Sequence, residues 1–224
     1  YFGFQVNDIL SYQADYNLME MFSANAGEQM KVHVDSDCWL ATFNGSHAAN
    51  KGATAGVISG NYNLGTDAAP VALTKDNILP TILAMASVLD EQNVPEDGRW
   101  LVLTPRERYL LMQSNLAQAY YTGDSSSPVR NGKLGKIDRF DLYVSNLLPE
   151  AAVNKDWLGA ASAGTVKRHA LVAGHNTAIT FAGQITKTEH LRNPNDFGDL
   201  VRGLKVFGRK VVKPESMVTL VAAG

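Results

Sequence analysis

The chain is poor in cysteine, in net charge and in long hydrophobic runs. Cys38 is the single cysteine among 224 residues, which excludes an internal disulfide and fits a reducing compartment. The formal net charge of −2 gives no bulk attraction to nucleic acid or to an anionic membrane. No apolar run approaches the length needed to cross a bilayer, so we expect no membrane partner. With 45% hydrophobic residues, the composition predicts a folded globular protein with a substantial core.

Familiar catalytic motifs are missing as well. The chain has no Gly-x-Ser-x-Gly turn, Ser-x-x-Lys pair, Gly-x-Gly-x-x-Gly loop or His-Glu-x-x-His sequence. The strongest remaining candidate is HVDSDC, in which His33 and Asp37 would share one helix face and could supply two ligands to a divalent metal. Such pairs are common by chance, and the sequence offers no further ligand cluster, so a solvated or salt-bridged helix face is the favoured interpretation. We therefore expect no catalytic residue, no cofactor and no bound metal.

The first part of the chain predicts a strand and then a long helix. YFGFQVND reads as the second half of a strand, and because the chain starts there with Tyr1, we expect the native polypeptide to be longer at its N-terminus. Residues 11–43 contain no proline, and apolar side chains recur there at four-residue spacing. This stripe winds around a helix, so different neighbours must cover its two ends. Its members are Leu18, Phe22, Ala26, Met30, Val34 and Cys38.

Residues 44–69 are rich in glycine, alanine and asparagine, which predicts a loop-rich crossover between two subdomains. Its expected hydrophobic anchors are Val57, Ile58, Tyr62 and Leu64.

The middle of the chain predicts a helix, strand, helix, loop and strand. Residues 77–91 have helical periodicity, and RWLVL reads as a strand. Thr104 suits an N-cap, Pro105 the first helical position and Glu107 the third position of a capping box, so a helix is expected over 105–119. A polar, Gly- and Ser-rich excursion follows, and then the strand RFDLYV.

The last third predicts mostly strands: RHALVAG, GQITKTEHLR, LVRGLKVFGRKVVKP and a returning SMVTLVAA, with a short helical piece around 176–181. Basic residues cluster in the third of these strands, where alternation would spread them over both faces. Intersubunit salt bridges or solvated side chains are favoured there over a nucleic-acid stripe. The cluster consists of Arg202, Lys205, Arg209, Lys210 and Lys213.

Three stretches carry a family resemblance. A strand enters a helix through a proline-containing turn in VPEDGRWLVLTPRERYLLMQS, and a glycine, short turn and strand lead to a Ser-Asn-x-Leu-Pro ending in GKIDRFDLYVSNLLP. The closing segment, from RHALVAG to VTLVAA, has a Pro-Glu turn before its last strand. Their shared order resembles the major capsid proteins of tailed bacteriophages, which have the Hong Kong 97 fold. The resemblance covers nearly the whole chain, although the family's N-terminal arm and most of its extended loop have no counterpart here.

The resemblance implies an α+β fold with a long spine helix, a peripheral-domain sheet and a mixed α/β axial domain. Residues 1–10 would end the strand of the extended loop, 11–74 and 176–207 would form the peripheral domain with the spine helix over 11–43, and 75–175 and 208–224 would form the axial domain. The implied function is a non-enzymatic major head protein of the virion that is assembled in the host cytoplasm. Its hexamers and pentamers would close an icosahedral shell around double-stranded DNA without sequence specificity, with scaffolding, portal and decoration proteins as further partners.

Assembly contacts are expected in two places. The excursion from Tyr121 to Gly135 would lie near a symmetry axis, where each copy meets its neighbour. The charges expected to make contacts between copies are Asp124, Arg130 and Lys133 in this excursion, and Arg202 and Arg209 in the basic strand. Two alternatives stay open: an encapsulin-type compartment that encloses protein cargo, and a metal-dependent enzyme that uses His33 and Asp37.

Overall fold

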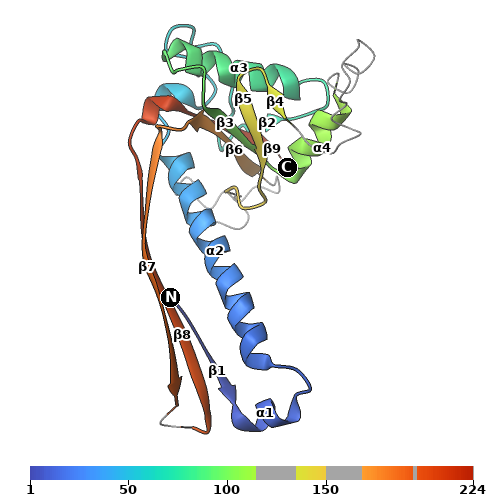
Figure 1. Ribbon diagram of the computed structural model, residues 1–224. Helices are drawn as coiled ribbons and strands as arrows, with labels where there is room; N and C mark the ends of the chain where they lie inside the picture. Colours follow the sequence, from blue (N-terminus) through green and yellow to red (C-terminus); the bar gives the residue numbers. More distant parts are fainter. Residues whose placement is uncertain (115–134, 150–167, 194–195, 224) are drawn as a thin grey trace. The chain divides into compact units, whose positions relative to one another are not determined.

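A computed structural model describes residues 1–114, 135–149, 168–193 and 196–223 of the chain (Figure 1). The protein divides into two compact units, and the chain passes between them more than once. Unit 1 consists of Tyr1–Cys38 and Phe181–Lys210, and unit 2 of Trp39–Thr180 and Val211–Gly224. Both units are therefore built from segments far apart in sequence.

Unit 1 contains a three-stranded sheet in the order β1-β8-β7. β1 (Phe2–Asn7) runs antiparallel to β8 (Gly198–Val211), with Phe2 opposite Gly203 and Asn7 opposite Gly198. β7 (Ile179–Arg192) is the other edge strand. All three strands are those predicted from the sequence. The first ends at Asn7 because the Asn7 side chain accepts a hydrogen bond from the Ile9 N–H at 3.0 Å and so caps a short helix, α1 (Asp8–Gln13).

The long helix α2 (Leu18–Asn44) is confirmed, but its predicted start at residue 11 is wrong. The chain leaves α1 at Ala14, which is extended (φ −83°, ψ 133°). Asn17 then caps α2, because its side-chain oxygen Oδ1 accepts from the Glu20 N–H at 3.3 Å, and its side-chain nitrogen Nδ2 donates to Glu20 Oε2 at 3.4 Å. This Asn-x-x-Glu signal for a helix start is local and can be read from the sequence. The absence of proline over residues 11–43 does not by itself predict one continuous helix.

Unit 2 is built on a six-stranded sheet in the order β2-β9-β6-β3-β5-β4 (Figure 1). β3 (Arg99–Leu103) is parallel to β5 (Phe140–Val144) and antiparallel to β6 (Arg168–His175). β9 (Met217–Ala223) is antiparallel to β6 and parallel to β2 (Val71–Ala72), and β4 (Lys136–Ile137) forms a hairpin with β5. The C-terminal strand does return to an earlier sheet, as predicted, and almost all of β6 and β9 is buried.

Among the described residues, two α-helices lie wholly within unit 2, and both occur where the sequence predicts them. α3 (Ile78–Glu91) buries the predicted stripe of Ile78, Ile82, Met85 and Leu89. α4 (Pro105–Gln113) follows β3 directly, and the rest of its predicted span, 115–119, lies outside the described residues. The largest fully buried core side chains of the sheet include Leu101, Leu103, Phe140, Leu171 and Met217.

The stretch predicted as a crossover is an ordered part of unit 2. It contains a short 3₁₀ helix (Ala48–Asn50), and the Val221 N–H donates to the carbonyl oxygen of the buried Leu64 at 2.9 Å. The whole stretch lies within the segment Trp39–Thr180 of unit 2. Val57 and Ile58 are wrong as anchors, because they are 53% and 81% exposed.

The helical piece predicted around 176–181 is wrong. Asn176 and Thr177 form a tight turn from β6 into β7, closed by the Ala178 N–H, which donates to the His175 carbonyl at 2.9 Å. The β-branched residues that follow favour an extended chain. A second 3₁₀ helix (Pro214–Ser216) precedes β9 at the predicted Pro-Glu turn.

Candidate functional site

The predicted metal-ligand pair is split between two different environments on α2. His33 is exposed, whereas the Asp37 carboxylate forms an ion pair with the Arg209 guanidinium of β8. Across residues 1–114, 135–149, 168–193 and 196–223, no group of three or more His, Cys, Asp or Glu side chains could hold a metal. Asp37 therefore lies on a salt-bridged helix face, which is the interpretation that the sequence favours over a metal site.

The strand-to-helix junction at Thr104 has the predicted position but a different hydrogen bond. The Thr104 carbonyl accepts from the Arg108 N–H at 3.1 Å, and Pro105 occupies the first turn of α4. The Thr104 hydroxyl donates to the Glu107 carboxylate instead of accepting from a backbone N–H. The expected capping box is wrong in this respect, because Glu107 is fully buried and needs donors of its own.

Glu107 and His169 form a buried pair that connects α4 to β6. His169 is 8% exposed, and its Nε2 lies 2.5 Å from Glu107 Oε1. Burial by itself raises the pKa of Glu107, but the hydrogen bonds from His169 and Thr104 and the nearby imidazole outweigh it, so the pKa lies below its ordinary value. The carboxylate is therefore ionised and accepts from both neighbours. No local sequence signal could find this pair, since its members are separated by 62 residues.

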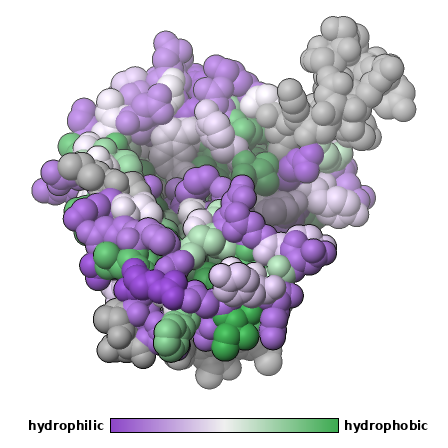
Figure 2. Space-filling model, turned by 60° about the horizontal axis from the view of Figure 1, so that its bottom comes forward, coloured by the Kyte–Doolittle hydropathy of each residue, from purple (hydrophilic) through white to green (hydrophobic). Residues whose placement is uncertain are grey.

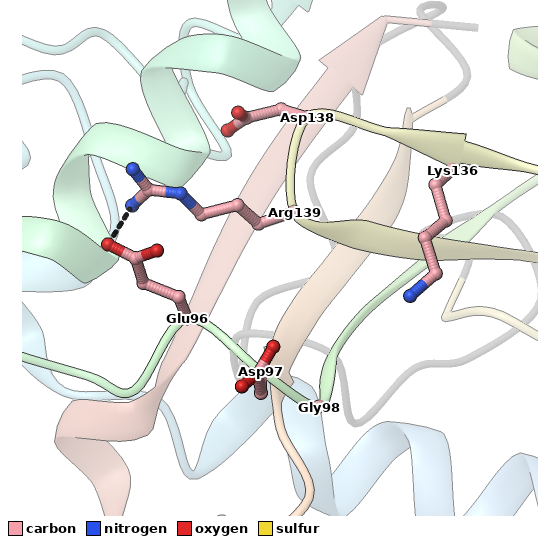
Figure 3. A pocket seen from close by; sticks show the side chains of 6 residues that line it. All are labelled: Glu96, Asp97, Gly98, Lys136, Asp138 and Arg139. Carbon is pink, nitrogen blue, oxygen red and sulfur yellow. Dashed lines mark ion pairs between the residues drawn. The ribbon is translucent and has the colours of Figure 1, made fainter.

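A small polar pocket of about 190 Å³ lies between the loop before β3 and the β4–β5 hairpin (Figure 3). Its lining residues are Glu96, Asp97, Gly98, Lys136, Asp138 and Arg139. Figure 3 shows Arg139 reaching across to Glu96, and this ion pair measures 3.2 Å. Arg139 also pairs with Asp90 at 2.9 Å. Because these charges compensate one another and an apolar wall is lacking among the lining residues, the pocket does not resemble a small-molecule site.

Arg99 anchors the same loop from inside the core. The residue is 1% exposed; its Nε donates to the Pro95 carbonyl at 2.9 Å and its Nη2 to the Val94 carbonyl at 2.6 Å. The Asp90 carboxylate at the end of α3 compensates its charge at 2.7 Å. This arrangement is structural, because the guanidinium closes the connection between α3 and β3.

The residues expected to make assembly contacts are only partly described. Asp124, Arg130 and Lys133 lie outside the described residues. Arg202 Nη2 pairs with Glu189 Oε2 of the neighbouring strand at 2.7 Å, and Arg209 pairs with Asp37. Hydrogen bonds from Lys187 and Arg202 lower the pKa of Glu189. Both described arginines therefore stabilise unit 1 within a single chain.

In the part of the chain that the structure describes, no helix combines the length and hydrophobicity needed to cross a membrane. A protein-family model described as phage capsid protein matches residues 2–220, and no curated protein matches the chain.

Several solved structures share the fold. The chain is similar to one from Mycobacterium phage Che8 with a TM-score of 0.73 and 24% identity, over 98% of this chain and 68% of that one. A capsid structure of the cyanophage P-SCSP1u gives a TM-score of 0.71 and 16% identity, over 100% and 71% of the two chains. A virus-like particle from Pyrococcus furiosus gives 0.51 and 14% identity, over 97% and 73%. With its mixed helix and sheet architecture and a family match over nearly its whole length, the chain belongs to the phage capsid protein family and has a Hong Kong 97-like fold.

Proposed function

We propose that this chain is a major capsid protein whose hexamers and pentamers close an icosahedral shell around double-stranded DNA. The observation that carries the proposal is the family match over residues 2–220. The small net charge supports it, because a shell lining should not bind DNA tightly while DNA is packed and released. The role is structural and requires neither catalysis nor a cofactor. The protein would reside in the virion after assembly in the host cytoplasm.

In this proposal, unit 1 is the peripheral domain, with α2 as its spine helix, and unit 2 is the axial domain. The chain itself is the main partner, and scaffolding, portal and decoration proteins are further partners. Arg202 and Arg209 remain proposed contacts between copies. A guanidinium has five N–H donors, so Arg202, whose side chain is 56% exposed, can bind Glu189 and still donate to a neighbouring copy.

The likeness to the Pyrococcus furiosus particle keeps a second candidate open, an encapsulin-type compartment that holds protein cargo. Particle contents separate the two functions. Particles purified from the native source and treated with nuclease should retain double-stranded DNA. Protein cargo in place of DNA would favour the compartment.

Electron microscopy of the expressed full-length protein tests the assembly itself. We expect closed shells with six-fold and five-fold capsomers at protein concentrations at which light scattering rises. A chain that stays monomeric at every accessible concentration, with and without added scaffolding protein, would contradict the proposal.

The excursion from Tyr121 to Gly135 provides a second test of assembly. Replacing residues 125–131 with a brief glycine linker should leave the monomer folded but reduce ring or shell formation. In a closed ring, a weak contact such as Asp124 with Arg130 or Lys133 of the next copy is repeated around the axis. Normal assembly of this variant at the parent's concentration would remove support for an axial position of the excursion.

A further inference from the structure

We draw no further inference here: the strongest candidate, the set of large hydrophobic side chains that are exposed on unit 1, such as Ile9, Phe197 and Leu204, carries no proposal, because exposed hydrophobic residues lie among hydrophilic ones on the face that Figure 2 draws, and nothing in the structure shows what covers them.

Discussion

Removing the carboxylate of Glu107 should destabilise unit 2 more than removing any exposed carboxylate. Glu107 is fully buried and accepts hydrogen bonds from His169 and Thr104. A hydrogen bond to a charged group contributes about 1.5–3 kcal/mol, so the loss of two such bonds in Glu107→Ala should cost about 3–6 kcal/mol. This agrees with the loss of about 3–5 kcal/mol that is typical when a buried charged pair is broken. Glu107→Gln should cost less, about 1–2 kcal/mol, because the amide oxygen can replace one carboxylate oxygen as the acceptor for His169, and the amide N–H can donate to the Thr104 hydroxyl, which also accepts.

The same carboxylate determines the direction in which the stability of unit 2 changes with pH. The pKa of Glu107 in the folded protein lies below its ordinary value of 4.5, so its contribution is complete above pH 4.5 and is lost as pH falls through the folded-state pKa. The free energy of unfolding of the parent should therefore fall on acidification from neutral pH. Glu107→Gln should show a smaller fall, since the titrating group is gone.

Urea unfolding followed by circular dichroism, at neutral pH and in an acidic series, measures both effects. Glu215→Gln is the control, because Glu215 is exposed, and it should behave like the parent. The reasoning would be refuted by a loss below about 1 kcal/mol in Glu107→Ala. It would also be refuted if Glu107→Gln and the parent lost the same stability on acidification.

Three further predictions concern single sites. Asn50→Ala should lower the urea midpoint by the equivalent of about 3 kcal/mol. The reason is that the buried Asn50 side-chain amide donates to the backbone carbonyls of Glu215 and Met217, at 2.7 and 2.8 Å. An unchanged midpoint would contradict this. Thr104→Ala should cost about 1 kcal/mol by removing a donor to a buried carboxylate, and a midpoint equal to the parent's would show that the hydroxyl is not needed. Calorimetric titration with zinc or manganese should find no tight site at His33 and Asp37; one tight site per chain would refute the prediction.

Periodicity and turn chemistry are enough to predict most of the described helices and strands from the sequence. α3 and β3 were predicted within a residue of their bounds, because their patterns of buried side chains repeat along the chain. The break between α1 and α2 was missed although Asn17 and Glu20 encode it locally. The turn at Asn176 was missed because a short stretch without strong periodicity supports more than one local structure.

The sequence by itself determined the order of the elements and the family resemblance, since both rest on turns, caps and apolar spacing that act over a few residues. Tertiary structure alone decided which distant groups meet. Glu107 finds its donor in His169 only because β6 packs beside the helix that follows β3, and Arg209 meets Asp37 only because β8 lies against α2. The exposure of individual large side chains is likewise not readable from the sequence. Tyr12 and Phe197 are large aromatic residues of the kind that often lie in a core. They are exposed here because the folded chain buries other side chains instead.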